Sequence, residues 1–174
     1  MEASVASPRE MKATPTTTAG SRDLSLAALS GLVTVKAVEY PTGLFPPSYI
    51  RFNVWSGTLT ILVSSAPSGG QGVNVYYGAM HTLDASSSTL PVYMENLVAT
   101  GAAAYAALEW ASFATNRINV GGEDVWRQYL VWGQDRMAGF MRRLSQLSRK
   151  NAVRARSMYV PAQPGPSQTS NWGA

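Results

Sequence analysis

Apolar and polar residues alternate through the first half of the chain, which is the pattern of half-buried β-strands. Two alternating runs, YIRFNVW and TLTILVS, flank Ser56 and Gly57, and a two-residue connection of this kind suits a tight hairpin turn. The run LVTVKAVEY at residues 32–40 alternates and then changes phase, which predicts a strand with a bulge. With VNVYYG at residues 73–78, these runs predict an antiparallel β-meander of three to four strands over about residues 32–78.

In the second half, the spacing of apolar residues changes to three and four, which predicts two helices over about residues 90–150, separated by INVGG. The second helix carries a strict seven-residue seam, the pattern of a helix that packs lengthwise on another. The positions of this seam are Trp126, Leu130, Gly133, Met137, Phe140, Leu144 and Leu147. Glycine in a helix costs about 1 kcal/mol relative to alanine, so we expect Gly133 to mark a helix crossing.

A sheet of three or four strands buries one face and needs a cover. The helix pair is the cover that the sequence offers. We therefore predict an α+β fold in which a small antiparallel β-meander packs on an antiparallel two-helix pair, within a single domain of residues 23–160. LSLAAL at residues 24–29 predicts a short helical turn, and NAVRARSMYV at residues 151–160 predicts a short strand.

Residues 1–22 and 161–174 are rich in Ser, Thr, Pro, Ala and Gly and contain little that could form a core. We predict that both segments are extended arms. Trp172 stands alone in the second arm, and two interpretations of it stay open. It fills a pocket on another subunit, or it belongs to an inert tail.

Charge is distributed unevenly along the chain, although the net charge is only +4. Residues 1–125 hold 6 Lys and Arg against 9 Asp and Glu, whereas residues 126–174 hold 8 against 1. The basic third predicts an anionic partner, either nucleic acid or the acidic part of a neighbouring copy. Its candidate interface or DNA-facing residues are Arg142, Arg143, Arg149, Lys150, Arg154 and Arg156.

The first helix has the opposite character, because it carries only Glu95 and Glu109 between residues 89 and 116 and is crowded with alanine. A helix that is apolar nearly all round has to be covered on most sides, and a chain of 174 residues has limited material for this. We therefore expect assembly with other copies. The candidate subunit-packing residues are Gly101, Ala104, Tyr105, Glu109 and Trp172.

Residue types that carry catalysis or bind cofactors are scarce. The chain has no cysteine, which excludes thiolate metal sites and a cysteine nucleophile, and His81 is its one histidine. The glycine-rich SGGQG lacks the lysine and the hydroxyl residue that reach phosphate in a P-loop. We predict no catalytic, cofactor-binding or metal site, and hence no enzyme. The apolar run at residues 97–116 contains Glu109 and falls short of a membrane span, so we expect no membrane partner.

Five segments carry a resemblance to a known family: LVTVKAVEYP, PPSYIRFNVWSGTLTILV, VYYGAMHTLDASSSTLP, ENLVATGAAAYAALEWASFATNRINVGG and the arginine-rich helix that closes with NAVRARSMY. In their order along residues 32–159, the chain resembles the head-to-tail connector or adaptor proteins in the neck of tailed bacteriophages. The resemblance implies a structural virion protein, assembled in the host cytoplasm, that forms a homo-oligomeric ring of commonly twelve copies. Such a ring joins the portal protein to the tail proteins, and genomic DNA passes through its lumen.

The chain departs from the family pattern in one respect, because many adaptors are helical bundles with a small hairpin, whereas here a substantial sheet precedes the helices. A tail-completion or minor capsid role therefore stays open. Two further alternatives are a viral coat or capsid-decoration subunit and a cellular DNA-binding module whose reader is the second helix. Coat proteins often carry a basic arm, but the N-terminal arm holds Arg9, Lys12 and Arg22 against Glu2 and Glu10, and Asp23 follows directly after it.

Overall fold

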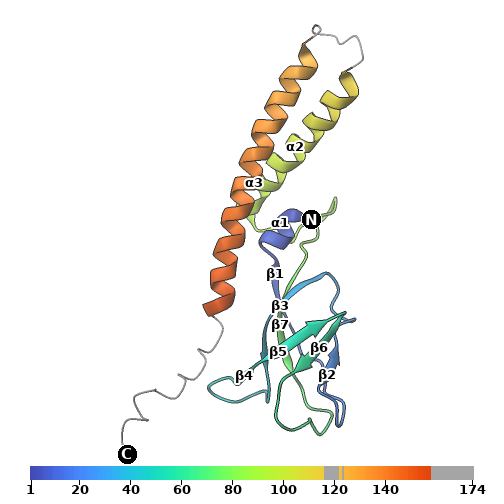
Figure 1. Cartoon of the computed structure of the whole chain (residues 1–174), viewed down its shortest axis with the longest axis vertical. Helices are drawn as coiled ribbons and strands as arrows, with labels where there is room; N and C mark the ends of the chain where they lie inside the picture. The colour runs from blue at the N-terminus through green and yellow to red at the C-terminus, as the bar shows by residue number, and fades with distance from the viewer. Residues whose placement is uncertain (116–121, 123, 158–174) are drawn as a thin grey trace, which may run out of the picture. The chain divides into compact units, whose positions relative to one another are not determined.

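The computed structural model describes the backbone of residues 1–115, 122 and 124–157, and the side chains of that part as far as residue 151. The chain divides into two compact units. We call residues 10–79 the β unit, and residues 1–9 together with 80–151 the helical unit. The elements are, in chain order, α1 (Glu2–Ala6), β1 (Arg9–Ala13), β2 (Asp23–Ser25), β3 (Leu32–Glu39), β4 (Tyr49–Ile50), β5 (Phe52–Trp55), β6 (Thr58–Ile61), β7 (Asn74–Ala79), α2 (Val92–Ala114) and α3 (Val125–Ser157) (Figure 1).

The β unit contains two sheets. A four-stranded sheet has the order β1-β7-β3-β4, and a three-stranded sheet has the order β2-β6-β5. The predicted hairpin is formed by β5 and β6, with Val54 opposite Leu59, and its turn residues Ser56 and Gly57 both have positive φ angles. The register of β3 against β7 shifts at two places, which confirms the irregularity that the phase change in the sequence predicted.

The core of the β unit lies between its own strands. The fully buried Val38 and Val75 come from the four-stranded sheet, and the fully buried Leu59 and Ile61 come from the three-stranded sheet. The α+β class, with antiparallel strands and a pair of packed helices, is confirmed. The helix pair was expected to cover the strands, but the structure differs. Strand β2 and the β5-β6 hairpin form a second sheet, and the side chains of this sheet pack into the core against those of the four-stranded sheet.

The helical unit is built on α2 and α3, which run antiparallel side by side (Figure 1). Its core combines Met94 and Leu97 of α2 with Phe140 and Leu144 of α3, and α1 adds two alanines. The predicted seven-residue seam of α3 is confirmed, since all of its positions are buried or half-buried. Gly133 is a point of close approach, as expected: a Cβ there would lie 3.1 Å from the side chain of Leu108.

The N-terminal segment is not a free arm. Residues 2–6 form α1, and residues 9–13 form β1, which pairs with β7 at the edge of the four-stranded sheet. Thr14 Oγ1 donates to Asn74 Oδ1 at 2.9 Å, and Thr17 N donates to Gln71 O at 2.8 Å. Long-range backbone and side-chain hydrogen bonds therefore order a segment whose composition indicated disorder.

Two short elements differ from the prediction as well. The segment LSLAAL was predicted to form a helical turn, but its first two residues belong to strand β2, in which Leu24 pairs with Leu59 of β6. The hydrogen bonds to the β5-β6 hairpin outweigh a weak local preference for helix. Residues 151–157 continue α3 where we expected a strand. Extending an existing helix needs no new nucleus, and alanine and arginine are good helix formers. Residues 158–160 of that predicted strand, and the whole predicted C-terminal arm, lie outside the described residues.

Candidate functional site

The small residues of α2 form a stripe that packs inside the chain. Gly101, Ala104, Ala107, Ala111 and Ala114 are all buried and recur at spacings of three and four. A Cβ on Gly101 would lie 2.8 Å from Cε2 of Phe140, so this stripe is where α3 approaches α2. The predicted role of Gly101 and Ala104 in subunit packing is therefore wrong, because their own chain covers both.

Other faces of the helix pair leave large apolar side chains exposed. On α2, Tyr105 belongs to this group and so lies on the surface as expected, and Glu109 is exposed near it. The exposed apolar residues of the two helices are Val92, Tyr93, Tyr105, Trp110, Phe113, Tyr129, Val131, Trp132 and Met141. We call this set the apolar helix surface. Trp110 of α2 and Tyr129 of α3 have ring centres 4.4 Å apart, so both helices contribute to one exposed aromatic patch there, and exposed apolar patches commonly mark a contact with another protein.

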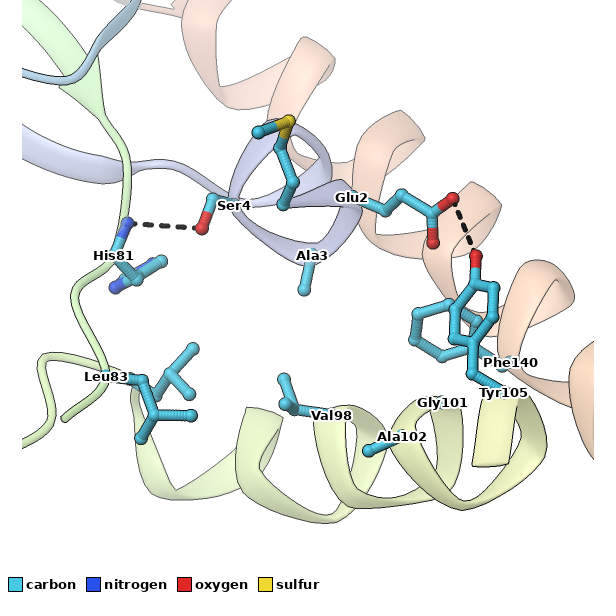
Figure 2. Close-up of a pocket in the computed structure, with 12 residues that line it drawn as sticks. Glu2, Ala3, Ser4, His81, Leu83, Val98, Gly101, Ala102, Tyr105 and Phe140 are labelled. Atoms are coloured by element: carbon cyan, nitrogen blue, oxygen red, sulfur yellow. Dashed lines mark hydrogen bonds between the residues drawn. The ribbon is translucent and has the colours of Figure 1, made fainter. Parts of the chain in front are cut away.

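The start of the chain is clasped to the helical unit by polar contacts (Figure 2). The hydroxyl of Tyr105 donates to Glu2 Oε1 at 3.1 Å, which raises the pKa of that phenol. The backbone N–H of His81 donates to Ser4 Oγ at 3.1 Å, and Asn151 Nδ2 donates to the carbonyl of Ala6 at 2.8 Å. These contacts hold α1 against the loop before α2, against α2 and against α3, all of which are more than seventy residues away in the sequence.

Both ring nitrogens of His81 take part in the same clasp. Nδ1 lies 2.8 Å from the carbonyl oxygen of Thr89, and Nε2 lies 2.9 Å from the carbonyl oxygen of Ser7. Both partners are acceptors, so the neutral ring donates to one of them and the protonated ring to both. His81 thus connects the N-terminal segment to the loop before α2.

A pocket of about 520 Å³ lies beneath this clasp (Figure 2). Its wall is mostly apolar, with Leu83, Leu90, Val98 and Phe140 among the lining residues. The polar side chains on the wall are those of Glu2, Ser4, His81 and Tyr105, and each already makes a hydrogen bond within the chain. The pocket is therefore an apolar recess whose polar side chains take part in the N-terminal clasp.

Asp84 organises the loop next to this pocket. Its Oδ1 accepts hydrogen bonds from the backbone N–H groups of Ser86, at 2.8 Å, and Ser87, at 2.7 Å, and both serine hydroxyls also donate to the carboxylate. Together these bonds lower the pKa of Asp84 to about 2. Asp84 thus stabilises a turn and lies with the serines rather than with the ring of His81.

The basic candidates all fall on α3. Arg142, Arg143, Arg149 and Lys150 have exposed side chains. Arg142 and Arg143 line a polar groove between the helices, and Arg143 and Lys150 line its continuation. Two further candidates, Arg154 and Arg156, belong to α3, but their side chains lie beyond the described part, and Trp172 lies outside the described residues.

The β unit contains a buried carboxylate that the sequence analysis missed. Glu39 accepts hydrogen bonds from Asn74 Nδ2 and from the hydroxyl of Tyr76, both at 2.9 Å. The bond from Asn74, with smaller contributions from Tyr76, Gly43 and the charge of Lys12, lowers the pKa of Glu39 despite its burial. Burial and Glu39 together raise the pKa of Tyr76 to about 12. Glu39 is the last residue of β3, near the end of the run LVTVKAVEY. Its burial could not be predicted, because nothing in the neighbouring sequence shows that Asn74 would lie beside it.

We expect the stability of the β unit to fall in acid through Glu39. The pKa of a glutamate is 4.5 in an ordinary environment, and that of Glu39 in the folded protein is lower. The ionised carboxylate therefore adds to the free energy of unfolding at pH values above 4.5, and this contribution is lost as the pH falls through the lower pKa of the folded protein. The difference in free energy of unfolding between the wild type and Glu39→Gln should therefore be largest near neutral pH and shrink toward pH 3. Urea unfolding over a series of pH values measures it. A difference that does not change with pH would contradict this role of the carboxylate.

Within the ranges that the structure describes, no helix is both long and apolar enough to cross a bilayer. In the same part of the chain, no three His, Asp or Glu side chains are grouped so that they could hold a metal ion. Compared with known protein families, with curated proteins and with solved structures, the chain matched none.

Proposed function

We propose that this chain is a structural virion protein of a tailed bacteriophage, which forms a ring between the portal of the head and the tail. The observation that carries the proposal is the apolar helix surface. Val131 is 65 % exposed and Phe113 is 61 % exposed, although both belong to well-formed helices. Leaving such side chains in water forgoes about 1.5–3 kcal/mol each relative to full burial. A partner that covers the two helices recovers this free energy.

A ring suits this surface better than a two-fold dimer does. In a ring, two different surfaces of the same chain meet at every contact, whereas a dimer joins one surface to itself. The helix pair carries two unlike surfaces, because α2 has only acidic charges and α3 holds the exposed arginines. Alignment of α2 of one copy with α3 of the next would join opposite charges as well as exposed apolar groups.

The position of the ring between head and tail is supported by the order of segments that resembles the neck adaptors. In this role the portal protein, the tail proteins and other copies of the chain are the partners, and the virion is the location. The role needs no catalysis.

The native mass of the full chain tests the assembly. We expect one defined large oligomer by light scattering, and closed rings by negative-stain electron microscopy, either alone or after coexpression with the portal protein of the same genome. The variant Phe113→Asp/Val131→Asp should raise the concentration needed for assembly at least about tenfold, which corresponds to about 1.4 kcal/mol.

Trp55→Asp is the control, because Trp55 is 84 % exposed but belongs to the β5-β6 hairpin of the β unit and not to the apolar helix surface. It should assemble like the wild type. A chain that stays monomeric at all concentrations and also ignores the portal would overturn the proposal. Equal defects in the control and the double variant would contradict the assigned surface.

A further inference from the structure

We propose that the groove between α2 and α3 binds the phosphate backbone of a nucleic acid. We call it the basic groove and define its cations as Arg136, Arg142, Arg143 and Lys150. The basic groove borders the apolar helix surface, because Trp132 and Tyr93 belong to that surface and also line the groove. The inference rests on the charges of the groove and does not depend on the assembly of a ring.

The basic groove is continuous along α3. One part, of about 470 Å³, is lined by Arg136, Arg142 and Arg143, and the next part, of about 430 Å³, is lined by Arg143 and Lys150. Gln146 lines both parts, and Thr100 and Asn96 form the α2 side. The groove therefore presents cations together with amide and hydroxyl groups, which are the usual partners of phosphate oxygens.

The spacing of the cations suits a polymer of negative charges. Arg136, Arg143 and Lys150 are seven residues apart and so stay on one side of the helix. With a rise of about 1.5 Å per residue, they extend over about 21 Å, which matches about six phosphates of one strand of a duplex. A single small anion would use only one end of such a row.

Among the residues that the structure describes, no acidic side chain forms an ion pair with a cation of the groove. The ion pairs in the described part join Lys36 to Glu10 and Arg127 to Asp124, and neither uses a groove cation. The guanidinium of Arg136 lies 5.3 Å from the ring centre of Trp132, which orients the side chain but leaves its charge. Asp135 is the one acidic residue on the wall, so the groove keeps a net positive charge.

A second copy of the chain offers this row a sparser set of negative charges than a nucleic acid does. Glu10 and Asp124 are held in ion pairs with Lys36 and Arg127, and Glu39 is buried. The carboxylates of α2, Glu95 and Glu109, stand fourteen residues apart, so they can balance at most two of the four cations. A nucleic acid backbone, with a negative charge at every phosphate, can balance the whole row.

The contacts predict binding that is independent of base sequence, because phosphates carry no sequence information. The test uses the full chain with a fluorescent 20-base-pair DNA duplex, and single strands of DNA and of RNA of the same length as separate arms. Fluorescence anisotropy gives the affinity at several salt concentrations. For a duplex, four phosphate contacts predict a slope of about −3.6 in log K against log salt, which is a loss of about 150-fold between 50 and 200 mM salt.

The variant Arg136→Gln/Arg143→Gln should weaken binding and reduce the magnitude of this slope by about 1.8. The matched control is Arg9→Gln/Arg51→Gln, which removes the same charge from two arginines that are exposed elsewhere. It should keep the slope of the wild type. A comparison of the affinities for duplex DNA, single-stranded DNA and single-stranded RNA shows which polymer the groove prefers.

Absence of binding to all three nucleic acids at 50 mM salt would overturn the proposal, and so would equal losses in the groove variant and its control. The mass of every sample is measured in parallel. A groove variant that binds nucleic acid normally but changes the mass of the assembly would show that the arginines meet an acidic protein surface instead. Failure of ring assembly with intact, salt-dependent binding would reject the proposed function and leave this inference standing.

Discussion

Replacing Gly101 with leucine is expected to destabilise the helical unit by about 3 kcal/mol. Even a single Cβ at this position would lie 2.8 Å from the ring of Phe140, which is closer than carbon atoms normally approach. Phe140 is itself buried between the helices, so its ring has no free space to move into. Insertion of a larger side chain forces α2 and α3 apart and uncovers Met94 and Leu97. Urea unfolding followed by circular dichroism at 222 nm measures the loss.

Ala103→Leu is the control for this substitution. Ala103 belongs to the same helix but is exposed, so a larger side chain there should change the free energy of unfolding by no more than about 0.5 kcal/mol. Shrinking Phe140 to leucine should recover part of the loss in Gly101→Leu, because the two side chains compete for one space. A stability for Gly101→Leu equal to that of Ala103→Leu would contradict the close crossing.

Replacing Ile61 with alanine should lower the free energy of unfolding by about 3–4 kcal/mol. Ile61 is 0 % exposed at the end of β6 and belongs to the core that both sheets share. Its removal leaves a cavity among Val38, Leu59 and Val75, whose backbones are held by strand pairing and cannot close it. Thermal and urea unfolding measure the effect, and hydrogen exchange of the β6 amides localises it.

The next residue in the chain provides the control. Leu62 is 50 % exposed, and Leu62→Ala removes a side chain of the same size from a position that still contacts water. We expect it to cost less than about 1 kcal/mol. If the two alanine variants lose similar stability, the proposed core between the sheets is wrong.

The elements that the sequence predicted well have a local cause. The Ser56-Gly57 turn follows from a two-residue connection, with glycine at its second position, between two alternating runs, and both residues have positive φ in the structure. The seam from Trp126 to Leu147 follows from helical spacing, which decides which side of α3 is buried. The charge difference between the two helices is a property of composition and needs no fold.

The candidate site could be predicted only in part. The exposed Arg142, Arg143 and Lys150 were found from their clustering on one helix, because a run of cations can rarely be buried. Gly101 and Ala104 were assigned to the wrong partner, since a stripe of small residues suits any close approach and does not show which helix makes it. The clasp of His81 was missed because it joins Ser4 and Ser7 to a loop far along the chain.

The sequence by itself determined the β5-β6 hairpin, the strands β3 and β7, the two long helices over most of their length, and where positive charge gathers. Only the tertiary structure decided which surfaces meet. Sheet covers sheet in the β unit, α3 covers the small residues of α2, and the N-terminal residues 2–13 become α1 and an edge strand. The physical reason is that apolar contacts are non-directional, so periodicity shows that a face is buried without naming its cover. Hydrogen bonds between distant segments, such as those of β1 and His81, then select one arrangement, and they leave no local signal.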